Sequence, residues 1–360
     1  MNLAFLSNSL RTWGGAERLV MDLAIELQKK DGLNVYVIVA NDFGGNEEEL
    51  KSNGVTPVAL NVDVSPLSVP NGVHNLSKII NRWDIDIVHS HLPFSHLLAR
   101  MACIRHSTPN VSTYHNISDH KSLEKRLMER ITKPFTNQII CVSNGVKESY
   151  PNNDSMSVIY NAIDIKTFSD QVSGSSPPEL NTDLSKKTVF LNVARYKKQK
   201  QQEYILKALE ELDTEELHVL LVGSGPRKET LEELVAEKGL SHCVTITGYV
   251  DEIEPYYKIA DVFVSSSLNE GLPTTHIEAM AARLPVVSTE IPGVTEVVEH
   301  GETGLLYPVG DPEKLASAMQ SIQEDIESFG EKGFEKAVST FSLDEIARQN
   351  LSLYREIDSS

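Results

Sequence analysis

Short apolar runs rich in β-branched residues alternate with amphipathic stretches along almost the whole chain. The apolar runs are Leu3–Leu6, 35–40, 85–89, 111–114 and 139–142 in the first half, and 189–193, 219–223, 244–246, 262–265 and 286–288 in the second. Continuous Val, Ile and Leu runs are typical of strands that are buried on both faces of a sheet. Their alternation with helices predicts α/β domains with parallel strands and crossover helices.

One polar segment, Ser173–Pro178, interrupts this alternation. Its Ser, Gly and Pro residues are typical of a linker, and polar residues continue after it. The sequence therefore predicts a linker over 171–187 that separates two halves of similar length and pattern. We expect an N-terminal Rossmann-like domain over 1–170 and a C-terminal Rossmann-like domain over 188–340.

Helices are predicted from the spacing of apolar residues. In residues 16–29 the apolar side chains recur at helical spacing, at Ala16, Leu19, Val20, Leu23, Ala24 and Leu27. Near the C-terminus, Ser342 and Glu345 have the spacing of a capping box, which predicts a helix over about 343–357. One side of that helix would carry Ile346, Ala347, Leu351 and Tyr354, and its simplest role is to cover a sheet.

Charge and cysteine content exclude several classes of function. The chain has 360 residues, with 33 basic and 51 acidic residues and a formal net charge of −18. General nucleic-acid binding is not expected, because it depends on neutralising phosphates with Lys and Arg. The three cysteines, Cys103, Cys141 and Cys243, are far apart and fit neither a disulfide framework nor a zinc site. No apolar segment approaches the roughly 20 residues that span a bilayer, and the first residues are interpreted as a strand and not a signal peptide.

Glycine-rich turns follow two of the predicted strands. Ligands of open parallel sheets bind beyond the carboxyl ends of the strands, so these turns are candidate binding sites. Gly14 and Gly15 lead directly into a helix, whose free N–H groups favour an anion. Gly223 and Gly225 precede a helix that would begin near Pro226. A backbone without side chains can approach a ligand closely, but a plain tight turn explains both pairs equally well.

Charged residues follow two other strands of the second half. Arg195 and Lys200 belong to a local basic cluster in an acidic chain, and their side chains suit phosphate oxygens, although a solvated loop is the simpler alternative. Seven residues separate Glu270, in a Gly- and Pro-containing loop, from Glu278, in the next predicted helix. A carboxylate in such a loop can bind the vicinal hydroxyls of a sugar or ribose. Each glutamate alone also fits an exposed or helix-terminal position.

Histidines end two predicted strands of the first half. His89 and His91 close one strand and His115 follows another, so His91 and His115 could form a polar site at the mouth of the sheet. A single histidine is usually structural. No Asp or Glu with ligand spacing accompanies them, so a metal is not expected.

Taken together, these motifs resemble the family 4 retaining glycosyltransferases of the GT-B fold, the glycosyl transferases group 1. The resemblance covers nearly the whole chain and follows one order, through Gly14-Gly15-Ala16-Glu17, Ile87–His91, Val142–Asn144, Tyr160–Asp164, Arg195 with Lys200, Gly223–Pro226 and Glu270 with Glu278. It implies two Rossmann-like domains facing across a cleft, with the C-terminal helix returning to the N-terminal domain. The chain departs from the family pattern where Ala162, Ala194 and Gln201 replace the usual glycines.

The resemblance also implies a role for each candidate residue on the donor side. Arg195 and Lys200 would bind the donor diphosphate and stabilise its charge as it leaves. Glu278 would accept hydrogen bonds from ribose, and Glu270 would bind hydroxyls of the transferred sugar. The backbone groups that would assist are those of Gly14, Gly15, Gly223, Gly225, Gly271 and Leu272.

On the acceptor side, the resemblance implies that His91 contacts the sugar or acceptor near the reacting carbon and that His115 belongs to the acceptor side. The implied reaction retains anomeric configuration, needs neither a divalent metal nor another cofactor, and moves a sugar from a nucleoside-diphosphate sugar, UDP by family frequency. The acceptor would be a glycan or a lipid-linked glycan. Another GT-B enzyme, such as an epimerase or a phosphorylase, and a non-catalytic nucleotide-sugar-binding module remain as alternatives.

The expected location is the cytoplasm, with peripheral contact at the inner face of the membrane. Residues 120–133 combine five basic residues with four large apolar ones, a pattern that suits an anionic membrane surface. Glu124 and Glu129 interrupt the pattern, so an ordinary domain helix is the alternative.

Overall fold

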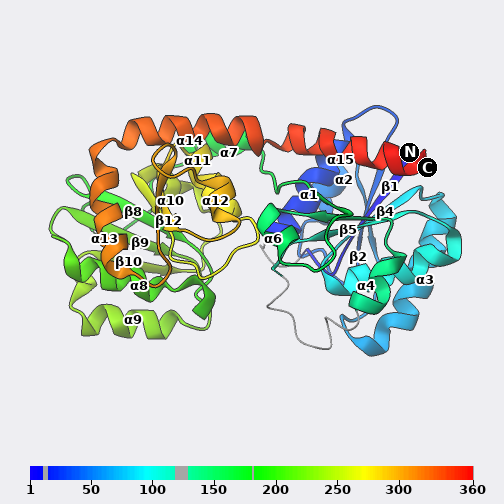
Figure 1. Ribbon diagram of the computed structural model, residues 1–360, viewed down its shortest axis with the longest axis horizontal. Coiled ribbons are helices and arrows are strands. Elements are labelled where there is room, and N and C mark those ends of the chain that lie inside the picture. Colours follow the sequence, from blue (N-terminus) through cyan, green and yellow to red (C-terminus); the bar gives the residue numbers. More distant parts are fainter. Residues whose placement is uncertain (11–14, 118–128, 181, 360) are drawn as a thin grey trace. The chain divides into compact units, whose positions relative to one another are not determined.

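The computed structural model describes residues 1–10, 15–117, 129–180 and 182–359. Its contacts divide the chain into two compact units. The first unit consists of Met1–Ala162 together with Leu343–Ser360, and the second consists of Ile163–Ser342. Each unit is built around one parallel sheet with helices on both faces (Figure 1).

The first unit contains a seven-stranded sheet in the order β3-β2-β1-β4-β5-β6-β7. Its strands are β1 Asn2–Ser7, β2 Asn34–Val39, β3 Thr56–Ala59, β4 Ile87–His91, β5 Asn110–Tyr114, β6 Gln138–Cys141 and β7 Met156–Val158. Its helices are α1 Gly15–Gln28, α2 Glu47–Ser52, α3 Val69–Trp83, α4 Pro93–His106, α6 Asn144–Glu148 and α15 Leu343–Asp358, with the short 3-10 helices η1 Pro66–Ser68 and η3 Lys133–Phe135. The strand order reverses between β1 and β4, which is where open α/β sheets bind ligands.

The second unit repeats this arrangement with six strands in the order β10-β9-β8-β11-β12-β13. Its strands are β8 Thr188–Val193, β9 Leu217–Val222, β10 Val244–Gly248, β11 Val262–Val264, β12 Val286–Thr289 and β13 Gly304–Tyr307. Its helices are α7 Ile165–Gly174, α8 Gln202–Ala208, α9 Lys228–Glu237, α10 Glu254–Ile259, α11 Thr274–Ala281, α12 Val294–Val297, α13 Pro312–Ser321 and α14 Ile326–Thr340, with the 3-10 helices η4 Lys198–Lys200, η5 Leu209–Glu211, η6 Leu240–His242 and η7 Ile322–Glu324. Here the order reverses between β8 and β11.

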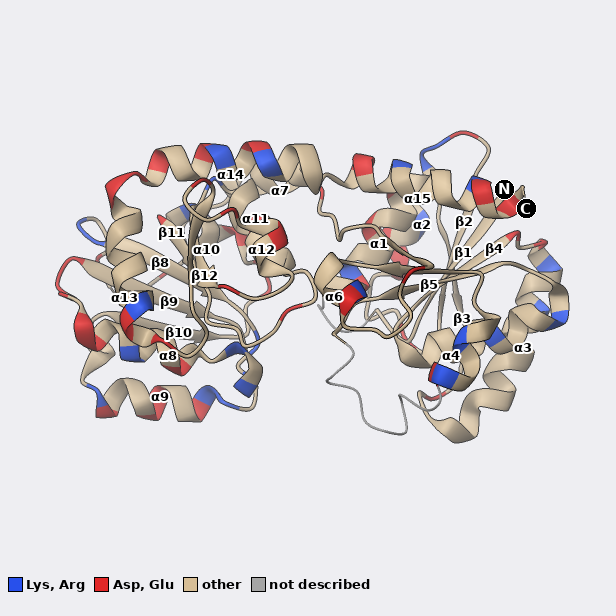
Figure 2. Ribbon diagram, viewed as in Figure 1, with Lys and Arg blue, Asp and Glu red and all other residues tan. Residues whose placement is uncertain are grey.

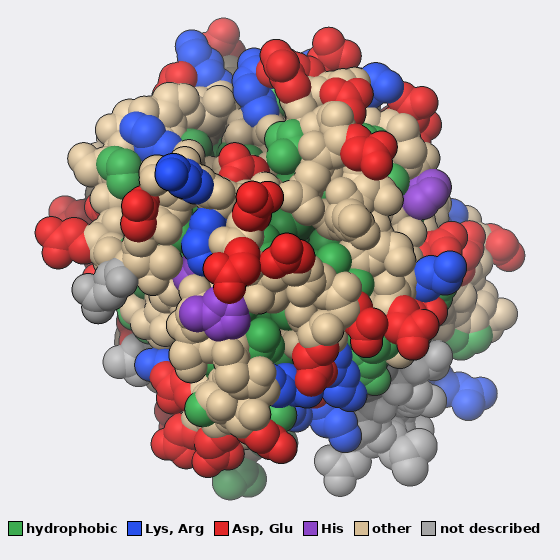
Figure 3. Space-filling model, turned by 90° about the vertical axis from the view of Figure 1, so that its left-hand side faces the viewer, with side chains coloured by type: hydrophobic (Ala, Val, Ile, Leu, Met, Phe, Trp, Pro, Cys, Tyr) green, Lys and Arg blue, Asp and Glu red, His purple; other side chains and the backbone are tan. Residues whose placement is uncertain are grey.

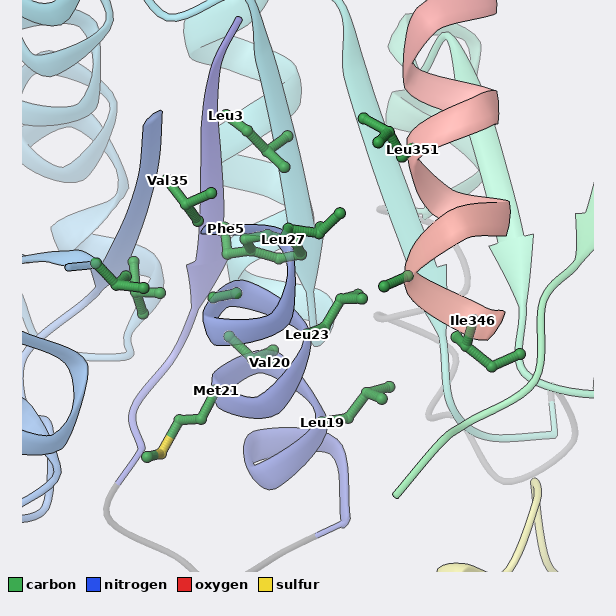
Figure 4. Close-up of a cluster of buried hydrophobic side chains, with 14 of the residues drawn as sticks. Leu3, Phe5, Leu19, Val20, Met21, Leu23, Leu27, Val35, Ile346 and Leu351 are labelled. Atoms are coloured by element: carbon green, nitrogen blue, oxygen red, sulfur yellow. The ribbon is translucent and has the colours of Figure 1, made fainter. Parts of the chain in front are cut away.

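The first strand shows why the sequence runs are continuously apolar. Successive residues of β1 point to opposite faces, so Leu3 and Phe5 pack under α1 and α15 while Ala4 and Leu6 pack with residues of α3 and α4. Figure 4 shows Leu3 and Phe5 beside side chains of α1, with Ile346 and Leu351 of α15 on the other side of the same cluster. Because helices cover both faces of the sheet at this strand, apolar side chains point to both sides of β1.

The ten predicted strands are all present, and three short strands, β3, β7 and β13, were not predicted. These three have only three or four residues each, and many of their side chains are partly exposed. The C-terminal helix also forms as predicted, and its apolar residues Ile346, Ala347, Leu351 and Tyr354 are all buried.

The predicted boundary at 170 and linker over 171–187 differ from the division that the contacts give. Residues 165–174 form α7, which packs on α10 and α11 and therefore belongs to the second unit. Lys258 of α10 donates hydrogen bonds to the carbonyl oxygens of Ser173 (2.8 Å) and Ser175 (2.5 Å). The chain passes between units at 162–163 and 342–343, and the polar segment lies within the second unit.

Candidate functional site

The two neighbouring strands at the reversal point of the second sheet each lead to a charged residue. Lys200 follows β8 and Glu270 follows β11, and the structure brings them together with 2.5 Å between Nζ and Oε1. Their side chains are only 23% and 11% exposed. The predicted cation and carboxylate are therefore a partly buried ion pair at the carboxyl edge of the sheet, where ligands of this architecture bind.

The surroundings of Glu270 favour its charged form. Burial alone would raise the pKa of the carboxyl, but the Lys200 ammonium and the Ser267 hydroxyl outweigh burial and hold the pKa below its ordinary value. His276 lies buried nearby on α11, where burial lowers its pKa to about 3. The site thus combines one fixed ion pair with a neutral imidazole.

Backbone contacts hold the two loops of this ion pair in register. The Ser266 hydroxyl donates to the carbonyl oxygens of Lys200 (3.0 Å) and Gln201 (2.8 Å). The Leu268 N–H donates to the Gln199 carbonyl at 2.9 Å. Since these bonds join the chain beside each charged residue, the separation of Lys200 and Glu270 is set by the loops and not by the ion pair alone.

Gln201, where the family pattern has glycine, adopts a backbone conformation that favours glycine. Its φ of +48° lies in the left-handed region. Adopting this region costs most residues with a side chain roughly 1–2 kcal/mol of conformational free energy. Its side-chain amide donates to the Lys198 carbonyl at 3.0 Å, and its own carbonyl accepts from Ser266. These hydrogen bonds hold Gln201 in a strained backbone conformation.

The glycines of the Gly223–Gly225 turn are required by the protein itself. A Cβ on Gly223 would lie 2.1 Å from the Ala194 carbonyl oxygen, and one on Gly225 would lie 2.5 Å from that of Tyr196. The Tyr196 N–H donates to the Ser224 carbonyl at 2.8 Å. The turn thus packs against the backbone of the loop that carries Arg195, which gives these glycines a structural role whether or not a ligand also approaches.

Arg195 and Glu278 lie outside the ion pair. Arg195 is exposed in the loop after β8, and its carbonyl oxygen accepts a hydrogen bond from Gln202 at 3.2 Å. Glu278 lies on α11 and accepts a hydrogen bond from the Tyr257 hydroxyl at 2.9 Å. Burial, opposed by Tyr257 and reinforced by Glu254, raises the pKa of Glu278 to about 7. The two glutamates of the motif therefore differ in charge near neutral pH.

Gly271 and Leu272 connect Glu270 to α11, and a glycine that sequence reasoning missed sets their position. Gly293 has φ +84°, and a Cβ there would lie 2.3 Å from the Gly271 carbonyl oxygen. The Pro292-Gly293 dipeptide marks a turn, and this turn signal together with its place between β12 and α12 could have drawn attention to it. Leu272 is buried and anchors the loop.

The reversal point of the first sheet holds histidines instead of an ion pair. His89 Nδ1 lies 2.5 Å from the Tyr354 hydroxyl of α15, and its Nε2 lies 2.6 Å from the Thr113 hydroxyl. Burial lowers the pKa of His89 to about 3. Tyr354 was predicted only as an apolar residue of a covering helix. Its contact with His89 shows that α15 also fixes the polar cluster.

The structure brings His91 and His115 together, with 3.0 Å between His91 Nδ1 and His115 Nε2. One of these nitrogens must donate the shared proton, so the tautomers of the two rings are linked. Burial lowers the pKa of His91 well below its ordinary value and that of His115 to about 4. His91 Nε2 and His115 Nδ1 are buried without a hydrogen-bond partner among the described residues. His91, with Thr113 and Asn350, also lines a small cavity under α1 and α15.

Several predictions fall partly or wholly outside the described residues. Gly14 lies outside them, whereas Gly15 is the exposed first residue of α1. Of the predicted basic helix over 120–133, the structure describes only 129–133, of which 129–132 are helical. Within the described ranges no group of three or more His, Cys, Asp or Glu is arranged to hold a metal ion. Nor is any described helix long and apolar enough to cross a membrane.

Two family models together match most of the chain. Residues 13–167 match the model described as Glycosyltransferase Family 4, and residues 180–335 match the model described as Glycosyl transferases group 1. Alpha-maltose-1-phosphate synthase of Mycolicibacterium smegmatis is 28% identical over 96% of each chain. N-acetyl-alpha-D-glucosaminyl L-malate synthase of Bacillus anthracis is 24% identical, covering 78% of this chain and 77% of that protein.

Solved structures share the architecture. Anabaena HepE in complex with UDP superposes with a TM-score of 0.84 at 20% identity over 99% of this chain and 100% of that one. Sucrose-phosphate synthase of Thermosynechococcus elongatus gives a TM-score of 0.84 at 22% identity over 99% of both chains. Two parallel Rossmann-like sheets, the ordered motifs at their carboxyl edges and these matches lead to one conclusion: the chain belongs to the family 4, group 1 glycosyltransferases of the GT-B fold.

Proposed function

We propose that this glycosyltransferase moves a sugar from a nucleoside-diphosphate sugar, with UDP as the first choice, to a hydroxyl of a glycan or lipid-linked glycan, with retention of configuration and without a metal. The observation that carries the proposal is the Lys200–Glu270 pair at the reversal point of the second sheet. UDP and UDP-glucose occupy solved structures of HepE, which supports the choice of nucleotide.

Lys200 and Arg195 supply the positive charge that the reaction needs. The leaving diphosphate gains negative charge as its bond to the sugar breaks, and fixed cations stabilise that charge more than the bound ground state. Lys200 is held in place by its loops, whereas Arg195 is exposed and can turn toward phosphate oxygens. In the proposed step the phosphate oxygen leaves on the face where the acceptor hydroxyl attacks, and the diphosphate accepts the hydroxyl proton.

The two glutamates would divide the donor between them. Glu270 is ionised and faces Lys200, so it can accept hydrogen bonds from the hydroxyls of the transferred sugar. Glu278 would accept hydrogen bonds from ribose, which requires the ionised carboxylate. Because the pKa of Glu278 is about 7 without a ligand, we expect donor binding to strengthen as the pH rises through neutrality.

The first unit would bind the acceptor. His91 Nδ1 and His115 Nε2 share a proton, so of the two remaining nitrogens, His91 Nε2 and His115 Nδ1, one is a donor and the other an acceptor. Neither of these two nitrogens has a hydrogen-bond partner within the described part of the chain. This combination suits a sugar hydroxyl, which both donates and accepts. It also favours an active transferase over a module that only binds nucleotide sugars, because such a module needs no acceptor site.

Two measurements test the proposal. Titration calorimetry with UDP in excess EDTA should show binding, whereas binding that disappears with EDTA and returns with Mg²⁺ or Mn²⁺ would contradict metal independence. With a suitable acceptor, proton NMR of the first product formed should show the anomeric configuration of the donor. Release or isomerisation of the sugar without an acceptor product would favour another GT-B enzyme.

A further inference from the structure

Apolar side chains gather on one surface of the first unit, away from the strand ends described above. On α4, Met101 and Ile104 are 44% and 53% exposed. On the neighbouring segment, Ile131 and Phe135 are 58% and 50% exposed. These four are a large share of the exposed large hydrophobic residues in the described part of the chain, which also include Val64, Leu67, Tyr249, Leu268, Val309 and Val338.

A buried arginine joins the two segments that carry these residues. Arg100 of α4 donates from Nε to the Thr136 hydroxyl at 2.6 Å and from Nη1 to the Thr132 hydroxyl at 2.8 Å. The Asn110 side-chain amide, at the start of β5, donates to the Phe135 carbonyl at 2.8 Å. These bonds hold α4 and residues 131–136 together as one surface, so its apolar side chains are carried by well-anchored backbone.

The charge of this surface is opposite to that of the protein. Residues 87–117 and 130–147 contain no Asp or Glu, although the chain has 51 acidic residues. Figure 3 shows one face of the molecule, on which acidic and basic side chains are both spread among other residues. Arg105 and Arg130 are exposed beside the apolar residues, and the basic positions of α4 are coloured in Figure 2. Glu129, which precedes Arg130, interacts with Tyr114 inside the unit.

Exposed apolar side chains beside exposed arginines match the interface of an anionic lipid bilayer. Aliphatic and aromatic residues enter the boundary between headgroups and acyl chains, while Lys and Arg remain among anionic headgroups. A second copy of this chain fits less well, because an identical surface would bring cations against cations. The last turns of α4 and η3 precede β5 and β6, so this surface lies at the amino edge of the sheet and leaves the carboxyl edge uncovered.

We propose that Met101, Ile104, Ile131 and Phe135, bordered by Arg105 and Arg130, form a docking surface for an anionic lipid bilayer. This inference does not depend on the transferase activity. The wild-type chain should sediment with vesicles of phosphatidylcholine and phosphatidylglycerol, should bind less as salt increases, and should not sediment with phosphatidylcholine alone.

Matched variants locate the contact. Phe135→Glu and Ile104→Glu should each weaken vesicle binding at least about tenfold, because a carboxylate would have to enter the interface. Leu67→Glu changes a side chain that is 92% exposed elsewhere in the same unit and should bind as the wild type does. Arg105→Ser should weaken binding roughly fivefold, whereas Lys207→Ser in the second unit should have little effect.

Circular dichroism and UDP binding should be unchanged in all these variants, which separates membrane binding from folding and from donor recognition. Light scattering coupled to gel filtration supplies the other decisive result. If wild-type protein ignores anionic vesicles, or if all variants bind them equally, the proposal is wrong. A dimer that Phe135→Glu dissociates, without vesicle binding, would assign the surface to a second copy instead.

Discussion

The two sheets share a strand order, but the side chains at their carboxyl edges differ in chemistry. At the reversal point of the second sheet, Lys200 and Glu270 form an ion pair in which the lysine holds the pKa of the Glu270 carboxyl below its ordinary value. At that of the first sheet, burial keeps His89, His91 and His115 neutral, and they bond to each other or to hydroxyls. The same scaffold can thus present fixed charge for a diphosphate or neutral hydrogen-bonding groups for hydroxyls, and the side chains after the strands decide which.

The largest expected effect tests the charged side of this comparison. Lys200→Ala should lower kcat on the order of 100-fold or more, because one well-placed group that stabilises developing charge is worth about 3 kcal/mol. Nucleotide affinity should fall less. Lys197→Ala and Lys198→Ala are the controls, since both lysines are exposed in the same loop. Similar losses in all three variants would mean that the loop provides only a diffuse positive field.

Glu278 is the exception on the charged side, and its titration should appear in the stability of the protein. The pKa of Glu278 is about 7 in the folded protein against an ordinary value of 4.5. The free energy of unfolding that its protonated form contributes is therefore fully present below pH 4.5 and is lost as the pH rises through 7. Glu278→Gln keeps an acceptor for Tyr257 and removes the charge. At pH 8 the variant should be more stable by on the order of 2 kcal/mol.

Urea unfolding of wild type and Glu278→Gln at pH 5 and pH 8 measures this difference. The advantage of the variant should nearly vanish at pH 5, where both side chains are neutral. A constant difference at the two pH values would show that Glu278 does not titrate near neutrality.

For the neutral histidine cluster of the first sheet, we expect that removing a hydrogen bond lowers stability without a strong salt dependence. Tyr354→Phe removes the hydroxyl that lies 2.5 Å from His89 Nδ1 and leaves that buried nitrogen unsatisfied. The expected cost is about 1–2 kcal/mol. Because neither partner is charged, thermal unfolding should show the same cost at low and high salt. Val338→Ala, at an exposed apolar position of α14, is a control expected to be near neutral.

The smallest expected effect concerns the strain at Gln201. Gln201→Ala and Gln201→Gly both lose the hydrogen bond to the Lys198 carbonyl, but only glycine adopts φ +48° without strain. Gln201→Gly should therefore be more stable than Gln201→Ala by about 1 kcal/mol. Equal stabilities in denaturant titrations would show that the left-handed conformation costs little here.

The sequence predicts the fold well because apolar runs report burial on both faces of a sheet. It also finds the ends of strands, where Lys200, Glu270, His91 and His115 lie. It does not predict which of these residues pair, because Lys200 and Glu270 are 70 positions apart and meet only when β8 and β11 become neighbours. Nor does it show that Tyr354 reaches His89, or that Gly293 supports Gly271, since both contacts join segments without a shared motif.

The path of the chain has a consequence for folding during synthesis. The second unit is continuous from Ile163 to Ser342, and its two ends lie side by side, with the Ile163 N–H donating to the Phe341 carbonyl at 3.3 Å. The first unit includes α15, whose residues are the last of the described chain to leave the ribosome. The unit that is synthesised first therefore completes its core last. The contact between His89 and Tyr354 can form only after all residues of the second unit have been synthesised.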